Sequence, residues 1–284
     1  MFTSFGRSWQ LVKASWAFLS TNKSFVMFPI LSGIASIIAA VVLLLPAGIV
    51  AGIFSAGDST SSNGDGTSII GLVLLFLFYL VMYTISLYFN VALTGAILKE
   101  LDGVDVNVGY GLSVANKKLG KIIQYAAVSA TVGVILSQLK EKGGIVGSLV
   151  SSLGGLAWNL VTFFVVPLMI VEDKGVIDLI KESGSLLKST FGEQVAGGIG
   201  VGAVTGLASF ALIVIGFVLG WLFQGSGTLL LLLGVVVVVG FVFIMLIGSM
   251  LSAVYRVMVF RYAQTGLVPG NMDESLLKAA FKSK

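Results

Sequence analysis

Six long stretches of apolar sequence constrain what this chain can fold into more than any other feature. They cover residues 25–53, 69–98, 122–139, 144–171, 194–223 and 228–258, which together make up more than half of the 284 residues. The first five contain no charged residue, and the sixth contains Arg256 near its end. About 20 apolar residues in a helix are enough to cross a bilayer. The sequence therefore predicts an all-α polytopic membrane bundle of six transmembrane helices.

The composition supports this prediction and excludes several classes of chemistry. Charged residues make up 11% of the chain, whereas a soluble domain has roughly a quarter. The chain has no Cys and no His, so thiolate chemistry, disulfides and imidazole ligands are excluded. We find no phosphate-binding loop and no nucleophile elbow. We expect a protein that is not an enzyme, with no catalytic residue, no cofactor, no metal site and no nucleic-acid partner.

The basic residues give the six helices a direction. Fifteen of the 17 Lys and Arg residues fall on one side of the predicted spans, and Lys140 and Lys142 fall on the other. Basic residues collect in the cytoplasmic loops of membrane proteins, so both termini are predicted to be cytoplasmic. Residues 1–270 are predicted to form a single transmembrane domain. Residues 271–284 should form a short cytoplasmic helix, with Asn271 as its cap.

An amphipathic stretch precedes each pair of spans, which suggests one unit written three times. Each stretch has apolar residues at helical spacing. The three sets are Phe5, Trp9, Val12, Trp16 and Leu19; Leu112, Ala115, Leu119 and Ile122; and Val176, Leu179, Ile180, Ser183, Leu186 and Leu187. We expect cytoplasmic elbows that set how each hairpin enters the bilayer, with Trp9 and Trp16 as interfacial anchors. The alternative is that these helices bind lipid headgroups or a partner.

The fifth span and the hairpin of the third and fourth spans carry residues of special interest. Glycines at close spacing in the fifth span should let another helix approach it; they are Gly198, Gly202, Gly206, Gly216 and Gly220. The third and fourth spans are the most polar, with Gln124, Ser129, Thr131, Ser152 and Asn159. These side chains should form hydrogen bonds between helices, and the alternative is a solute path. Pro167 is expected to bend the fourth span near its cytoplasmic end.

The charges near the spans have structural interpretations and functional ones. Arg256 lies five residues before Arg261, so both should anchor the sixth span by reaching the headgroups. The alternative is a buried cation at Arg256, paired with Glu172 or Asp173. Those two acids follow the fourth span beside Lys174, and we expect them to be solvated rather than to form a metal or acid–base pair. No carboxylate lies well inside a span, which argues against a proton relay.

Three regions resemble known families. The segments Gly6–Trp9, Lys13–Trp16 and Phe28–Gly33, with Phe260–Ala263 and Leu276–Phe281, resemble an uncharacterised family of prokaryotic six-span membrane proteins. Residues 167–189 are loosely similar to the membrane domain of glycerophosphodiester phosphodiesterases, in which a Pro, an acidic turn and a Ser-containing amphipathic helix follow one another. The resemblance implies a helical bundle in the inner membrane. It carries over no activity, because the phosphodiesterase catalytic domain is absent here.

These observations favour a non-enzymatic scaffold or lipid-organising component of the cell membrane. Its partners are expected to be membrane lipids and either further copies of itself or the other subunits of a membrane complex. The alternative is a channel or facilitator for a small solute or ion, which would pass along the polar third and fourth spans.

Overall fold

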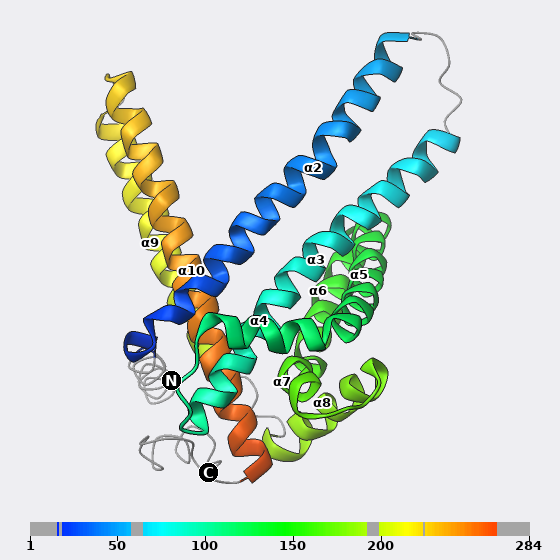
Figure 1. Ribbon diagram of the computed structural model, residues 1–284. Coiled ribbons are helices and arrows are strands. Elements are labelled where there is room, and N and C mark those ends of the chain that lie inside the picture. Colours follow the sequence, from blue (N-terminus) through cyan, green and yellow to red (C-terminus); the bar gives the residue numbers. More distant parts are fainter. Residues whose placement is uncertain (1–15, 17–18, 58–64, 192–198, 224, 266–284) are drawn as a thin grey trace. The chain divides into compact units, whose positions relative to one another are not determined.

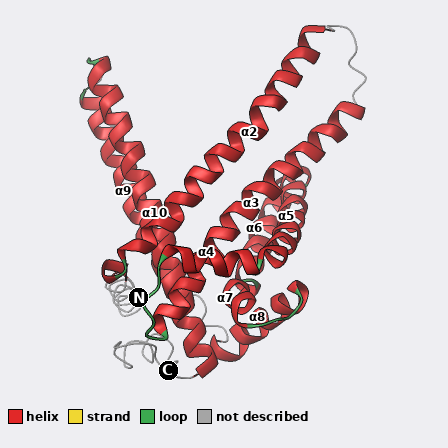
Figure 2. Ribbon diagram, viewed as in Figure 1, coloured by secondary structure: helices red, strands yellow, loops and turns green. Residues whose placement is uncertain are grey.

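The computed structural model describes residues 16, 19–57, 65–191, 199–223 and 225–265. In this part of the chain helices are joined by short turns and there is no strand, so the all-α class is confirmed there (Figures 1 and 2). The elements are η1 (Lys23–Val26), α2 (Met27–Gly57), α3 (Asp65–Leu101), α4 (Val108–Lys117), α5 (Leu119–Lys142), α6 (Gly144–Val161), α7 (Val165–Val171), α8 (Val176–Phe191), α9 (Ile199–Leu222) and α10 (Gly227–Thr265).

In the part of the chain that the structure describes, six helical segments are long and apolar enough to cross a membrane. They are Lys23–Leu44, Phe76–Leu101, Leu119–Lys142, Gly144–Val171, Thr205–Leu222 and Gly227–Thr265. Each overlaps one of the six predicted stretches, which supports a multi-pass membrane protein. The helix that contains the sixth span continues to Thr265, beyond the predicted end of the apolar stretch at residue 258.

The chain divides into two compact units. Unit 1 consists of Met1–Pro29, Ala96–Asn107 and Ser185–Lys284, and unit 2 of Ile30–Gly95 and Val108–Gly184. Among the described residues, α9 and α10 form a closely packed helical hairpin in unit 1, and α5 and α6 form another in unit 2. The predicted division into residues 1–270 and 271–284 stays a prediction, because the tail lies outside the described residues.

The two helices of the unit 1 hairpin lie side by side (Figure 1), and glycines let them approach closely. A methyl group at Gly248 of α10 would lie 2.5 Å from the side chain of Thr205 on α9, and one at Gly216 of α9 would lie 2.7 Å from Val237. Eleven residues separate the α9 positions and eleven separate the α10 positions, as an antiparallel pair in constant register requires. The small residues therefore set how closely the two helices approach.

The unit 2 hairpin turns within two residues. α5 ends at Lys142 and α6 begins at Gly144, whose φ of +56° lies in the left-handed region that suits glycine. The amide of Gly143 donates to the carbonyl of Leu139 and closes the end of α5. The backbone of Gly147 passes so close to the same carbonyl that a methyl group there would lie 2.1 Å from its oxygen. Three glycines thus make this turn.

The predicted span of residues 144–171 is broken. α6 ends at Val161 and α7 starts at Val165, with a short turn between them. The bend expected from Pro167 is therefore confirmed near this end of the span. With 18 residues, α6 is about 27 Å long, close to the thickness of the hydrocarbon core of about 30 Å. α6 by itself can therefore cross the bilayer.

The second amphipathic stretch differs from its prediction. α4 ends at Lys117 and α5 begins at Leu119, so residues 112–122 do not form one continuous helix. Ala115 and Ile122 are buried as expected, but Leu119 is exposed because the break at Lys118 rotates it away from their face. The placement of Leu119 on the apolar stripe was wrong.

Close contacts hold α4 on α3 within unit 2. Tyr88 Oη donates a 2.8 Å hydrogen bond to Asn116 Oδ1, and a methyl group at Gly95 would lie 2.8 Å from Val114. The first amphipathic stretch lies mostly outside the described residues.

Candidate functional site

The most elaborate polar arrangement described in the chain lies in unit 2, where the fourth span ends and α8 begins. We call residues 162–183 the α8 elbow. It contains the helix break, α7, the turn of residues 172–175 and the first half of α8. Val176, Leu179 and Ser183 of the predicted apolar stripe are buried. The stripe therefore lies against protein, as an elbow that fixes a hairpin requires.

Pro167 explains where the helix breaks. A proline has no amide proton, and its ring clashes with the carbonyl four residues earlier, here that of Phe163. Pro167 instead occupies the third position of α7, where an amide would have no partner within the helix. The sequence thus fits a new helix start at Val165 better than a continuous helix.

The backbone amides of the break find partners nearby. Thr162 N–H donates to the carbonyl of Trp158, and Phe163 N–H donates to that of Leu160. The amide of Phe164 is the exception because its partner is a side chain: it donates a hydrogen bond of 2.9 Å to Ser183 Oγ on α8. Buried amides without a partner are costly, so this side chain replaces a backbone acceptor.

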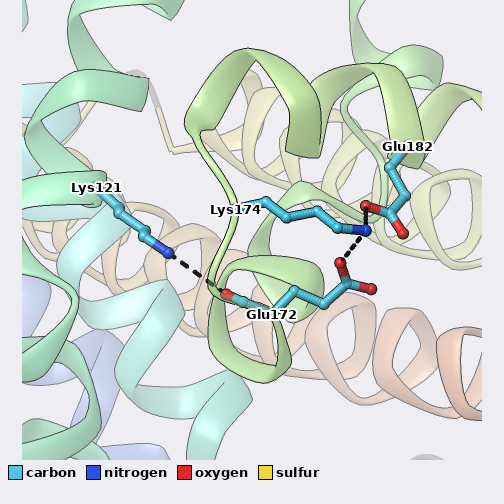
Figure 3. A network of polar contacts seen from close by, with 4 residues as sticks. All are labelled: Lys121, Glu172, Lys174 and Glu182. Atoms are coloured by element: carbon cyan, nitrogen blue, oxygen red, sulfur yellow. Dashed lines mark hydrogen bonds and ion pairs between the residues drawn. The ribbon is translucent and has the colours of Figure 1, made fainter.

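Two sets of ion pairs fasten the turn of the elbow, and Figure 3 shows the set around Lys174 together with the hydrogen bond from Lys121 to Glu172. Lys174 Nζ lies 2.7 Å from Glu172 Oε2 and 2.7 Å from Glu182 Oε2, which joins the turn to α8. Lys121 Nζ at the start of α5 lies 2.6 Å from Asp173 Oδ1. It also donates a hydrogen bond of 3.4 Å to the backbone carbonyl of Glu172. The acidic turn is therefore held from α5 and from α8.

The charges in this turn stabilise one another. The hydrogen bond and positive charge of Lys121, with a further contribution from Lys118, lower the pKa of Asp173. Hydrogen bonds to Glu172 and Glu182 raise the pKa of Lys174. Both groups consequently stay charged across the neutral range, which suits a structural clasp rather than an acid–base pair.

The prediction that Glu172 and Asp173 are solvated is right for one of them. The side chain of Asp173 is 93% exposed, whereas that of Glu172 is 23% exposed and its Oε2 is inaccessible to solvent. Glu172 is covered because its carboxylate turns toward Lys174. Among the described residues, no group of three or more acidic side chains could hold a metal ion.

The five polar residues of the third and fourth spans do not share one environment. Ser129 is buried, while Gln124, Thr131, Ser152 and Asn159 are exposed. Thr131 Oγ1 donates to the carbonyl of Ala127, and Ser152 Oγ donates to that of Ser148, each 2.8 Å away on its own helix. These two hydroxyls bond within a helix. The interhelical hydrogen bonds and the solute path both stay predictions.

The glycines predicted for the fifth span have different roles. Gly198 lies outside the described residues, and Gly202 lies in the first turns of α9. A methyl group at Gly206 would meet no described atom within 4 Å, whereas those at Gly216 and Gly220 would contact α10.

The glycines on the other side of this contact were not predicted from the sequence. Gly240 and Gly248 of α10 face Leu212 and Thr205 of α9. Their spacing of eight residues, close to two helical turns and a quarter, is a weak signal within a span rich in glycine and valine.

The predicted anchors are described in part. Trp9 lies outside the described residues, and Trp16 is exposed. Arg261 forms an ion pair with Asp102 in unit 1, so it has a protein partner besides the predicted headgroups. Arg256 is half-buried and its Nε is inaccessible to solvent. Both interpretations of Arg256 stay predictions.

The comparison with protein families identifies the region that contains these features. Residues 69–270 match the "Family of unknown function (DUF6159)", a range that covers both hairpins and the α8 elbow. The chain belongs to this family. The resemblance to an uncharacterised family is therefore supported. No curated protein and no solved structure matches the DUF6159 chain, and the similarity to the phosphodiesterase membrane domain gains no support.

Proposed function

We propose that this DUF6159 protein is a non-enzymatic, self-associating scaffold that organises the cell membrane. In this proposal it lies in the inner membrane with both termini in the cytoplasm. Its partners are lipids and further copies of the same chain. It consists of three repeats of an amphipathic helix and a transmembrane hairpin. The order of short α4 before the α5–α6 hairpin and α8 before the α9–α10 hairpin supports the repeat.

The outer face of α9 is the observation that carries the proposal. Phe210, Val214, Phe217 and Trp221 follow one another at helical spacing, on the side of α9 away from the positions that contact α10. The three aromatic side chains are 64%, 78% and 66% exposed. Aromatic residues are enriched in protein interfaces, and a stripe of them in a membrane helix suits packing against another helix. We call these four residues the α9 stripe.

The composition of the hairpin supports a packing role. α10 also exposes large aliphatic side chains, such as Leu231 and Val235. These surfaces suit lipid tails and protein helices.

The mass of the protein in native lipid particles tests self-association. We expect particles with more than one chain, and we expect the double variant Phe210→Ala with Phe217→Ala to shift them toward single chains. The matched control is Leu149→Ala with Leu156→Ala, which removes two exposed residues at the same spacing from α6. Single-chain particles of the unmodified protein, or equal effects of the two double variants, would contradict the proposal.

The alternative is a channel or facilitator. It is favoured by Gln124 and Asn159, whose amide side chains are exposed on segments that could cross a membrane. Polar groups in such places usually face water or another polar surface. Flux of ions or small solutes into liposomes would test it. The scaffold proposal predicts no flux above that of empty liposomes, and flux that is lost in Asn159→Leu would favour the channel.

A further inference from the structure

We propose that Ser183 holds the fourth span in its broken form, so that docking of α8 and the break between α6 and α7 are one conformational event. The inference concerns unit 2 alone and does not depend on the scaffold proposal. It assigns to the α8 elbow the role of a latch on a membrane span.

Pro167 alone does not account for the hydrogen bonding at the break. Proline removes its own amide and hinders the carbonyl of Phe163, but it leaves the amide of Phe164 able to bond within a helix. In a continuous helix Phe164 N–H would donate to the carbonyl of Leu160. In the structure Phe163 N–H donates a hydrogen bond of 3.2 Å to the carbonyl of Leu160, and Phe164 N–H donates to Ser183 Oγ instead. Ser183 thus competes with Leu160 for one donor.

The surroundings of Ser183 leave the hydroxyl no access to water. Ser183 and Leu179 are 0% exposed. The next residue, Gly184, lies beside Val161, the last residue of α6, at a distance that would put a methyl group 3.5 Å from its side chain. The pair between Lys174 and Glu182 holds the same stretch of α8 to the turn. The hydroxyl of Ser183 therefore lies within hydrogen-bonding distance of Phe164 N–H only when α8 is packed against the break.

Undocking of α8 would leave the amide of Phe164 without its acceptor. In an apolar environment the amide recovers a partner by extending α6 until Phe164 bonds to Leu160. The fourth span would then run straight as far as Pro167. An unsatisfied buried amide is penalised strongly enough to shift this equilibrium roughly five- to hundred-fold.

Distances between spin labels at Leu156 and Val171 test the latch. Both positions are exposed and lie on either side of the break, and the chain has no native Cys to interfere. In one straight helix this separation of 15 positions would span about 22 Å along the axis. The labelled protein that keeps Ser183 and Pro167 should give a shorter distance. Ser183→Ala should add a population at a longer distance, below the straight-helix value because Pro167 remains, whereas Ser183→Thr, which keeps the hydroxyl, should not.

Two further variants complete the test. Ser189→Ala is the matched control, because Ser189 is exposed and its hydroxyl bonds to the carbonyl of Leu186 on its own helix. It should leave the distances unchanged. Pro167→Ala should keep the short distance while Ser183 is present. A folded Ser183→Ala protein with unchanged distances would overturn the proposal. If Ser183→Ala does not fold, the Pro167→Ala protein decides. A straight fourth span in Pro167→Ala would overturn the proposal, and a broken fourth span would support it.

Discussion

Replacing Gly147 by Ala should open the turn between α5 and α6. The new methyl group would lie 2.1 Å from the carbonyl oxygen of Leu139, where ordinary contacts begin at 3.4 Å. More than 1 Å of movement is therefore needed. A flexible side chain could move that far, but the neighbour is the backbone at the end of α5, whose carbonyl also accepts the amide of Gly143.

The size of the effect follows from two opposing contributions. Overfilling a packed site destabilises by about 1–3 kcal/mol, and a backbone neighbour places this site toward the upper end. Alanine in place of glycine in a helix recovers about 0.5–1 kcal/mol. We expect Gly147→Ala to lower the free energy of unfolding by about 2 kcal/mol.

Gly155→Ala is the matched control, because it makes the same change on the same helix. A methyl group at Gly155 would meet no described atom within 4 Å, so we expect stabilisation of about 0.5–1 kcal/mol. Unfolding of both variants in mixed micelles of increasing denaturing detergent, followed by far-UV circular dichroism, measures the difference. Equal midpoints for the two variants would refute the close approach at Gly147.

Two more predictions address the unit 1 hairpin and the ion pairs that fasten the turn of the α8 elbow, which act as a clasp. Gly216→Leu should disrupt the packing of α9 on α10 and lower stability by about 1–3 kcal/mol, while Gly206→Leu, at a position that faces no described atom, should not. Thermal unfolding in detergent compares the two variants, and equal losses of stability would contradict the register. The pair of Asp173 with Lys121 should contribute stability at pH values above 3.8, lost as the pH falls further, because the pKa of Asp173 is lowered. The pairs of Lys174 should contribute below pH 10.5 and be lost as the pH rises beyond it, because its pKa is raised. A spin label beside the turn should therefore report a constant environment from pH 5 to about pH 9, and a transition within that range would count against the clasp.

The spans could be predicted from the sequence because the bilayer imposes a simple rule. Length and lack of charge locate six apolar helices without knowledge of their neighbours. Pro167 likewise indicates a bend, because its ring and its missing amide proton disfavour a continuous helix whatever its neighbours are. The role of Ser183 could not be foreseen, because its hydroxyl acquires a partner only when residues 19 positions apart meet. Its place on the apolar stripe indicated burial but not the amide that it binds.

The packing of glycines shows the same limit. Glycine spacing along α9 predicted a face that another helix can approach, yet a methyl group at Gly206 would meet no described atom within 4 Å while one at Gly216 would lie against Val237. Which glycine matters depends on the register with α10, and the register is a property of two helices. Gly248 was missed for the same reason, since the bulk that it accommodates belongs to Thr205.

The contacts of unit 2 also limit where a solute path could run. A path between the third and fourth spans would require these helices to separate. The glycine turn closes one end of their hairpin, and at the other end Lys121 binds both Asp173 and the carbonyl of Glu172. A surface ion pair contributes at most about 1 kcal/mol, but it acts here together with a buried α7. A path would therefore follow exposed surface of the hairpin, such as that at Gln124 or at Asn159, and would need another protein surface to enclose it.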